Sequence, residues 1–425
     1  GDTIALASGA SQTGFGRTGT VDWQTSSIKT ATFTAVNGQG FFCDTNGGAF
    51  TANLPAGSAG AIVSFQDYRN TFDTANLTVT PNGSEKINGG QGSVVLSTEG
   101  EGITLVYIDS TVGWRSIQDN VFADVGSNFI VATGGTITNT GNCRIHTFTG
   151  PGTFTVCSVS NCAANNTVSH LVVAGGGGGG GSNVGGGGGA GGYREVKSPV
   201  TPYTASPLDG YPSSPNRVTV TAQSYPITVG GGGPAPNGNG NPSVFSTVTS
   251  TAGGAGKGGS TNGATGGSGG GGGENGGSGG AGNTPPVSPA QGFSGGAAPS
   301  TRGGGGGGAS EAGASGTSST GRGGNGVGTE INPAAGTPGP SGPLRYFSGG
   351  GGGGTYKCGS YPGAGPGGYG GGGTGAQGGP GSTAGVAGTT NSGGGGGGTG
   401  YTAGPAHGGA ANGGSGVVII RYKVQ

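Results

Sequence analysis

Methionine is absent from this 425-residue sequence, and charged residues make up only 8% of it. The 16 Lys+Arg balance the 16 Asp+Glu, so the formal net charge is zero. A nucleic-acid-binding protein needs a basic surface for phosphate groups, and this neutral composition argues against that class. No apolar run approaches the roughly 18 residues of a membrane-spanning helix, so membrane insertion is not expected.

The N-terminus lacks the charged region and apolar core of a signal peptide. Because methionine is missing even from position 1, we interpret the sequence as a processed or truncated product. The absence of a targeting signal therefore says little about location.

Cysteine is scarce, and the spacing of the five cysteines resembles no zinc motif. Cys157 and Cys162 could close a small disulfide loop, with buried or free thiols as the alternative. An odd number leaves at least one cysteine unpaired or paired between chains, and no metal site is expected.

Glycine is abundant instead, with 116 Gly and 24 Pro in the chain. Disordered chains of the usual kind combine low hydrophobicity with high net charge, which this chain lacks. A flexible linker of this length is also unexpected when only a short strand-like segment, 416–425, follows it. Two apolar runs, 171–174 and 416–422, bracket the glycine-rich region and indicate order.

Glycine lets backbones approach closely, and extended left-handed helices with three residues per turn can then pack side by side. Collagen requires a strict Gly-X-Y repeat, which runs such as 303–308 and 393–398 break. We therefore predict a polyglycine II bundle held by backbone hydrogen bonds between neighbouring helices.

The remaining sequence predicts an all-β protein with no α-helix of note. Short alternating segments separated by turn residues predict a small β module at 30–118, with tight reversals at sites such as Asn37-Gly38. The predicted organisation is an N-terminal segment 1–29, this module, a connector 119–140 and a glycine-rich domain 141–425. The glycine-rich domain divides into a β collar 141–174, a body 175–415 and a closing strand 416–425.

No motif indicates catalysis or a cofactor. The stretch 253–258 resembles a phosphate-binding loop but lacks the Ser or Thr after Lys257 and a following helix. The strand-like surroundings of His146 and His170 favour packed side chains over metal ligands. Glu99 and Glu101 are most simply a solvated turn rather than a glycosidase pair. We expect no enzyme activity and no cofactor.

Aromatic residues among Gly, Ser and Pro are candidates for contact with a receptor, because recognition surfaces use rigid rings with small polar neighbours. Clamping of glycine helices or burial against another subunit is the alternative. The candidates are Tyr203, Tyr211, Arg345, Tyr346, Phe347, Tyr356, Tyr361, Tyr369 and Tyr401.

Several ordered motifs carry a family resemblance. They are 146–156 (HTFTGPGTFTV), 170–177 (HLVVAGGG), 225–230 (YPITVG) and 413–422 (GGSGVVIIRY). This pattern resembles the glycine-rich domain of bacteriophage tail fibres and related virion proteins. More weakly, segment 34–114 is similar to a small β module in fibres of phages that infect marine bacteria and cyanobacteria.

The resemblance implies a virion appendage that recognises the host surface through loops on a glycine-rich scaffold. The expected partners are other copies of the chain, preferably in a homotrimer, other virion proteins, and a host cell-surface glycan or outer-membrane protein. The expected location is the virion. A purely structural capsid or tail decoration protein is the alternative, as is an extracellular ice-binding or adhesive glycine-rich protein.

Overall fold

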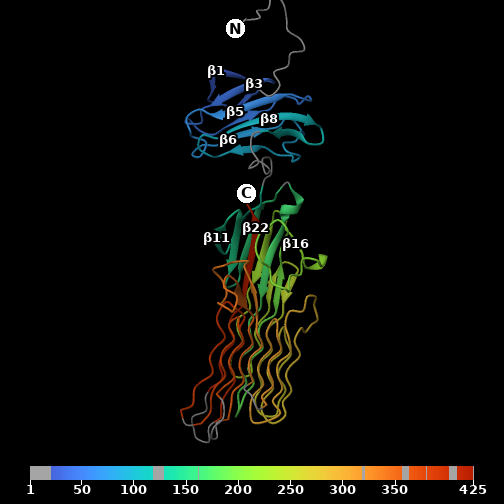
Figure 1. Cartoon of the computed structure of the whole chain (residues 1–425), viewed down its shortest axis with the longest axis vertical. Helices are drawn as coiled ribbons and strands as arrows, with labels where there is room; N and C mark the ends of the chain where they lie inside the picture. Colours follow the sequence, from blue (N-terminus) through green and yellow to red (C-terminus); the bar gives the residue numbers. More distant parts are fainter. Residues whose placement is uncertain are drawn as a thin grey trace, which may run out of the picture. The chain divides into compact units, whose positions relative to one another are not determined.

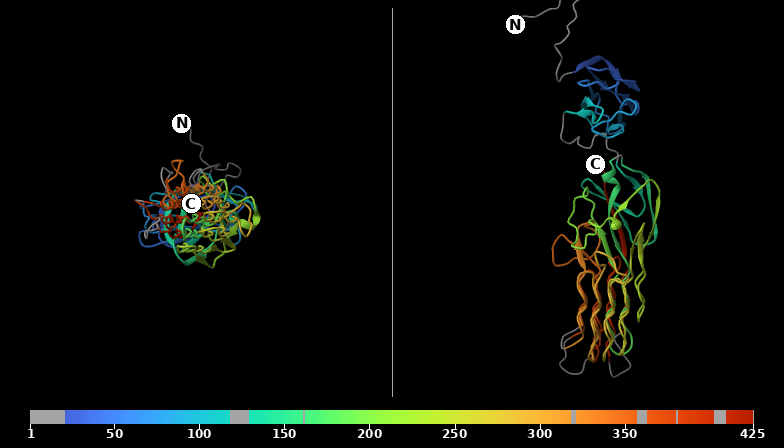
Figure 2. Two further views of the ribbon diagram at one scale, coloured as in Figure 1. Left: turned by 90° about the horizontal axis from the view of Figure 1, so that it is seen from below. Right: turned by 90° about the vertical axis from the view of Figure 1, so that its right-hand side faces the viewer.

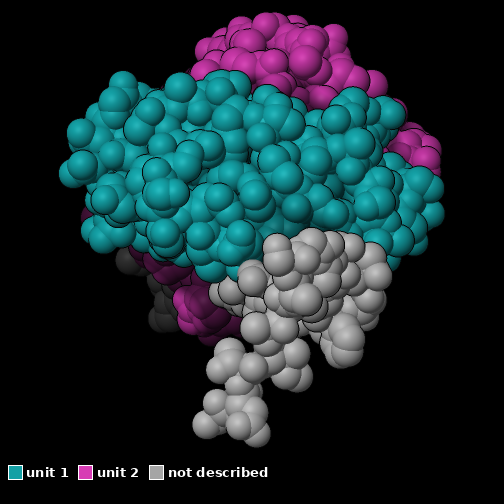
Figure 3. Space-filling model, turned by 90° about the horizontal axis from the view of Figure 1, so that it is seen from above, with its two compact units in different colours: residues 1–129, 160–162 teal, residues 130–159, 163–425 magenta. Residues whose placement is uncertain are grey.

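The computed structural model describes residues 21–117, 129–160, 162–317, 321–356, 363–379, 381–401 and 409–424. The chain divides into unit 1, residues 1–129 with 160–162, and unit 2, residues 130–159 with 163–425 (Figure 3). Strands and extended segments dominate, and the helical elements described are two short 3-10 turns, η2 (Ala163–Asn166) and η3 (Ser214–Asn216). The predicted all-β class is confirmed. None of the helical segments described has the length and apolar character needed to cross a membrane.

Unit 1 consists of two sheets around one apolar core, which includes Phe41, Phe65, Leu77 and Trp114. The first sheet has the order β1 (Asp22–Lys29), β3 (Gln39–Cys43), β5 (Ile62–Asp67), β8 (Gly102–Asp109) and β9 (Gly113–Ser116). The second has the order β2 (Phe33–Thr34), β4 (Phe50–Asn53), β6 (Leu77–Thr80) and β7 (Val94–Leu96).

Successive strands from β1 to β6 alternate between these two sheets, so β1, β3 and β5 are parallel, as are β2, β4 and β6. The turn at Asn37-Gly38, where Gly38 has φ 82°, therefore leads from one sheet to the other rather than closing a hairpin. Strand β1 belongs to the first sheet, although the sequence placed these residues in the N-terminal segment 1–29, outside the predicted β module.

Two further sheets form the part of unit 2 from which the glycine-rich body extends. One has the order β10 (Val131–Thr133), β13 (Gly152–Ser158), β17 (Ser224–Thr228), β18 (Ser243–Phe245) and β19 (Val248–Ser250). The other has the order β11 (Thr136–Thr140), β12 (Cys143–Phe148), β22 (Val417–Lys423), β14 (Thr167–Val173) and β15 (Tyr193–Val196), and β16 (Val218–Thr219) also pairs with β14. A separate pair joins β20 (Val327–Thr329) to β21 (Arg345–Phe347).

The closing strand β22 lies in the middle of its sheet, between β12 and β14. Val417 pairs with Val173, so the strand that ends the glycine-rich body lies beside the strand that begins it. The side chains of β22 are buried in two clusters: Val418, Ile420 and Tyr422 on one face, and Val417 and Ile419 on the other. The two apolar runs that bracket the body in sequence are thus neighbours in space.

The body itself is a bundle of extended glycine-rich segments, here called rods, which run side by side away from the sheets and back (Figures 1 and 2). In rod 175–181, successive N–H groups donate to three different neighbouring rods, and the pattern repeats at every third residue with N···O distances of 2.8–3.0 Å. The accepting rods are 238–241, 409–416 and 185–192.

The carbonyl groups of rod 175–181 accept from three further rods at the same spacing. The donating rods are 230–237, 253–257 and 393–399. Rods 185–192, 303–308 and 349–354 are surrounded in the same way. A three-residue period with lateral backbone hydrogen bonds on all sides is the polyglycine II arrangement that the sequence predicted.

Glycine is required inside this bundle because neighbouring backbones occupy the space of a side chain. A Cβ added to Gly188 would lie 2.0 Å from the carbonyl oxygen of Gly177, and one added to Gly306 would lie 1.9 Å from that of Gly188. On outer rods, exposed side chains recur at every third residue. Examples are Ser278, Ala281 and Thr284 on one rod and Thr383, Val386 and Thr389 on another.

Candidate recognition surfaces

Unit 2 has a sheet end and a far end, the latter being the end of the bundle away from the sheets (Figure 1). The described chain enters unit 2 through β10 and leaves it through β22, and both strands lie in the sheets. The far end consists of turns that join rods. Several of these turns contain residues with positive φ, namely Ser182 (68°), Asn183 (39°), Asn237 (66°) and Asn275 (62°).

Charged side chains hold the far-end turns in place. Glu274 is buried, and its Oε1 accepts a hydrogen bond from the backbone N–H of Val184 at 3.4 Å. The buried Arg302 donates from Nη1 to the carbonyl oxygen of Thr317 at 2.6 Å. The first bond joins residues 90 apart in the sequence and the second joins residues 15 apart, so side-chain hydrogen bonds fix the described turns of the far end.

Two of the candidate aromatics meet at this far end. The rings of Tyr356 and Tyr401 are stacked, with centroids 5.0 Å apart and an interplanar angle of 20°. Both residues are partly exposed, and a parallel backbone bridge joins them. Tyr361, a third candidate from the same part of the sequence, lies outside the described residues.

A second pair of candidates lies toward the sheet end. Tyr369 is 53% exposed, and its ring centroid is 6.4 Å from that of Tyr346, which is partly exposed. The ring of Tyr346 rests on the backbone of Gly339, where an added Cβ would lie 2.1 Å from it. The neighbouring Arg345 turns back into the same loop, because its Nη2 donates to the carbonyl oxygen of Gly336 at 2.7 Å.

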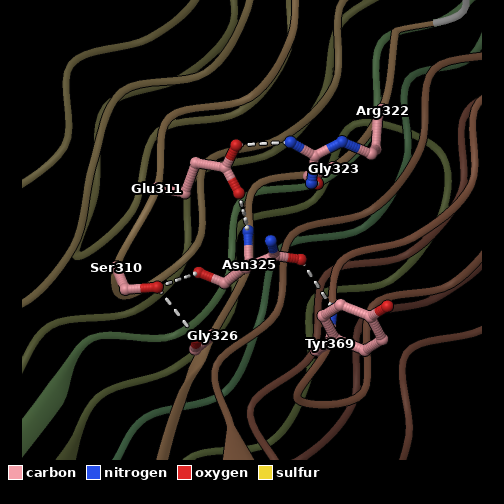
Figure 4. Close-up of polar contacts among 7 residues, drawn as sticks. All are labelled: Ser310, Glu311, Arg322, Gly323, Asn325, Gly326 and Tyr369. Carbon is pink, nitrogen blue, oxygen red and sulfur yellow. Dashed lines mark hydrogen bonds and ion pairs between the residues drawn. The ribbon is translucent and has the colours of Figure 1, made fainter. Parts of the chain in front are cut away.

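A polar network fixes the rods beside Tyr369 (Figure 4). Glu311 forms an ion pair with Arg322, which lowers the pKa of the Glu311 carboxyl. The other Glu311 oxygen accepts from the Asn325 N–H at 3.4 Å, and Asn325 Oδ1 accepts from the Tyr369 N–H at 3.2 Å. Ser310 Oγ donates to the carbonyl oxygen of Asn325 at 3.1 Å. The exposed ring of Tyr369 therefore projects from a braced backbone.

The structure contradicts the prediction that Phe347 contacts a receptor. Phe347 is fully buried and packs with Leu171, Ile331 and Ile419 against the sheet that contains β22. The sequence placed it in an exposed loop because it follows Arg345 and Tyr346 among glycines. It is instead the inward residue of β21, so its apolar ring contributes to the core.

Tyr203 and Tyr211 occupy the loop that follows β15. Tyr203 is partly buried, and its ring lies 5.0 Å from the guanidinium of Arg421 and 5.6 Å from Lys197 Nζ. Tyr211 is partly exposed, with the guanidinium of Arg217 4.2 Å from its ring centroid. Both rings contact cationic side chains of the same chain. Tyr203, which contacts two of them and is partly buried, has a structural role.

Arg421 is a residue that the sequence reasoning did not single out. Its side chain comes from β22 and is buried, with 3% exposed. Nη1 donates to the carbonyl oxygens of Glu330 (3.3 Å) and Ile331 (3.2 Å), and Nη2 donates to that of Pro202 (2.8 Å). Arg421 thus fastens two long loops to the closing strand. The sequence did contain an indication of this role, because an arginine stands within the otherwise apolar run 417–422.

The histidines in the strands are packed. His146 contacts the Tyr422 hydroxyl through Nε2 (2.9 Å) and the Gly134 carbonyl oxygen through Nδ1 (2.6 Å), and burial lowers its pKa. Neither ring nitrogen of the buried His170 has a hydrogen-bond partner, and burial, with Arg194 nearby, lowers its pKa to about 3. Both rings are therefore neutral near pH 7.

Glu195 is the most enclosed carboxyl group in this region. It accepts hydrogen bonds from the Tyr193 hydroxyl (2.7 Å), the Ser206 N–H (3.0 Å) and the Thr329 hydroxyl (2.6 Å). Burial raises its pKa. These hydrogen bonds join β15 to the loop that follows it and to β20. Glu195 therefore has a structural role. In the described part of the chain, no three His, Cys, Asp or Glu side chains are grouped to hold a metal ion.

The suggested disulfide between Cys157 and Cys162 is contradicted, because both residues are exposed free thiols. Cys43 and Cys143 are buried free thiols, and burial raises the pKa of Cys43 to about 12. The short spacing of Cys157 and Cys162 suggested a bridge, but Cys157 is at the end of β13 and Cys162 lies beyond it, before η2. Cys358 lies outside the described residues.

The fold and these surfaces define a glycine-rich β protein in which a polyglycine II bundle extends from a pair of sheets. The family model described as a glycine-rich domain matches residues 147–423. The chain therefore belongs to the glycine-rich domain family. No curated protein matches it.

Proposed function

We propose that this protein is a bacteriophage tail-fibre or fibre-tip structural protein that recognises the host surface through the far end of its glycine-rich bundle. Membership of the glycine-rich domain family supports this proposal, together with the ordered motifs that resemble those of virion proteins. In this proposal the protein is not an enzyme, is located in the virion and binds a host cell-surface glycan or outer-membrane protein.

The proposal rests on the difference between the two ends of unit 2. Its chain connections, β10 and β22, lie at the sheet end, so attachment through them leaves the far end free. The described part of the far end includes turns held by side-chain hydrogen bonds and the stacked pair Tyr356 and Tyr401. Side chains that such contacts already hold lose little conformational entropy on binding, and several copies add weak contacts through multivalency.

A homotrimer remains the proposed assembly, but its physical argument changes. Interior rods such as 175–181 find all their hydrogen-bond partners within one chain, so a trimer is not needed to satisfy them. Contacts between copies would instead involve the side chains on the outer rods. Analytical ultracentrifugation of the full chain tests this part, with a stable monomer as the contrary result.

The experiment that tests the function compares particles carrying variant chains. Tyr356→Ala with Tyr401→Ala is expected to reduce adsorption to host cells at least about tenfold, as for loss of a central aromatic contact. Ile137→Ala, which alters an exposed side chain on β11 in the sheets, is the matched control.

Particle yield and incorporation of the chain should be normal in both variants. If the far-end variant and a Tyr346→Ala, Tyr369→Ala variant both adsorb like the control, host recognition is refuted. The alternative, a capsid or tail decoration protein with a purely structural role, would then be favoured.

An ice-binding role is the second candidate, because exposed small side chains recur at every third residue on outer rods. Regular spacing of Thr, Ala and Ser could match an ordered water lattice. Inhibition of ice recrystallisation by the purified chain, lost on replacing Ala281 and Thr284 by Lys, would support this function. Absence of inhibition would exclude it.

A further inference from the structure

Three aromatic side chains form a line across the outer face of unit 1. Trp23 on β1 lies 4.9 Å from Phe42 on β3, and Phe42 lies 6.4 Å from Tyr68, which follows β5, in ring-centroid distances. These strands are neighbours in the sheet. Trp23 is 40% exposed, Tyr68 is 49% exposed and Phe42 is partly exposed. We call these three residues the aromatic line.

The outward orientation follows from strand alternation. Phe41 and Cys43 on β3 point into the core, so Phe42 between them points away from it. Trp23 pairs with Gly40, which is two residues before Phe42 and therefore on the same face. The aromatic line thus lies on the face opposite the core.

The rings are held in fixed positions. A Cβ added to Gly40 would lie 2.7 Å from the indole of Trp23, so this glycine provides the space in which the indole lies. At the other end, the Arg69 guanidinium is 5.6 Å from the centroid of Tyr68. Arg69 is in turn fixed by an ion pair with Asp44 at 2.7 Å, which lowers the pKa of the Asp44 carboxyl.

The surroundings of the line are polar but electrically balanced. Arg69 and Asp44 neutralise each other, and Gln66, which pairs with Phe42, donates from its side chain to the Gly100 carbonyl oxygen at 2.9 Å. These groups can exchange hydrogen bonds with hydroxyl groups, and they offer no excess of charge. The chemistry favours a neutral ligand with apolar faces and a hydroxylated rim.

The size of the exposed aromatic surface also limits the ligand. An aromatic side chain buries roughly 150–250 Å² when fully covered. With Trp23 and Tyr68 about half exposed, the line offers on the order of 200–300 Å². A stable protein interface buries about 800 Å² on each partner, of which these rings would supply only about a third, whereas the same area matches the faces of a few sugar rings.

We propose that the aromatic line of Trp23, Phe42 and Tyr68 is a binding site for a neutral glycan, separate from the recognition surfaces of unit 2. The C–H faces of successive sugar rings pack on the aromatic faces, and sugar hydroxyl groups bond to Gln66 and Arg69. This site does not depend on the proposed function of the far end, because it lies on another unit and uses none of the same residues.

Tryptophan fluorescence provides a specific test in the full chain. The chain has two tryptophans, and Trp114 is fully buried while Trp23 is 40% exposed. Titration with cellotetraose and chitotetraose should change the emission and protect one tryptophan from acrylamide quenching. Trp23→Ala and Tyr68→Ala should each weaken binding, measured by calorimetry, about tenfold.

Val95→Ala is the matched control, because Val95 is 48% exposed on β7 in the other sheet and should leave binding unchanged. Circular dichroism checks that each variant is folded. The proposal is overturned if neither neutral oligosaccharide protects Trp23, or if the control loses as much affinity as Trp23→Ala. It is also overturned if Trp23 becomes protected with rising protein concentration alone, which would indicate a second copy as the occupant.

Discussion

Replacement of Gly188 by alanine tests whether glycine is required by the lattice of the bundle. Gly188 lies on rod 185–192, where its N–H donates to the Gly396 carbonyl oxygen and its own carbonyl oxygen accepts from the Gly351 N–H, both at 2.8 Å. The new Cβ would lie 2.0 Å from the Gly177 carbonyl oxygen, whereas ordinary contacts begin at 3.4 Å. The neighbouring rods must therefore separate by about 1.4 Å, the difference between these distances.

Such a displacement breaks hydrogen bonds with more than one neighbour. Two lost bonds cost about 1 kcal/mol each, and overpacking adds about 1–3 kcal/mol, so the expected destabilisation is about 3–5 kcal/mol. For a unit of this size, the midpoint of thermal unfolding should fall by roughly 5–8 °C. Differential scanning calorimetry of the full chain measures the shift.

Gly409→Ala is the matched control. A Cβ at Gly409 meets nothing within 4 Å, and Gly409 is an exposed residue of an outer rod without a positive φ. This change should be neutral or stabilise by less than about 1 kcal/mol, because alanine reduces the freedom of the unfolded chain. If both variants unfold at the same temperature, the argument that backbone contact excludes side chains from the interior is wrong.

Two further changes test other parts of unit 2. Arg421→Met keeps the aliphatic stem but removes the bonds to both loops, so limited proteolysis in 197–217 and 330–344 should accelerate about tenfold. Arg115→Met, which changes an exposed arginine on β9 of unit 1, should leave these cleavage rates unchanged, and equal rates in the two variants would contradict the role of Arg421. Burial lowers the pKa of His170 from 6.5 to about 3, so the unfolded state binds a proton between these pH values that the folded state does not. The stability that the neutral His170 contributes is complete above pH 6.5, and it should fall by about 1.4 kcal/mol for each pH unit below that value. In urea unfolding measured at several pH values, His170→Leu should therefore reduce the loss of stability in acid. An unchanged pH dependence in this variant would refute the account.

The sequence carried much of the information about the glycine-rich body. Low charge and abundant glycine favoured lateral backbone bonding over disorder, and the apolar runs 171–174 and 416–422 predicted the strands that begin and close the body. Strands β14 and β22 confirm both. These features were predictable because they depend on composition and on short segments whose alternation of residues is visible in the chain.

The candidate sites were less predictable. Tyr346 and Phe347 are adjacent in a loop-like sequence, yet one ring is partly exposed and the other is in the core. The pairing of Tyr356 with Tyr401 joins residues on different rods. Trp23 was assigned to the N-terminal segment 1–29, outside the predicted β module, and its exposed position became clear only when β1 was placed beside β3. In each case the deciding contact is distant in sequence.

The sequence by itself determined that this chain forms strands and extended glycine-rich rods, because those states follow from local preferences and from the absence of side chains. Only the tertiary structure decided which rod lies beside which, that β22 occupies the middle of its sheet, and which aromatic rings reach the surface. Glycine offers no side chain to distinguish one neighbour from another. The order of the rods is therefore set by the simultaneous pairing of their backbone groups, together with the sheets that fix where the first and last rods begin and end.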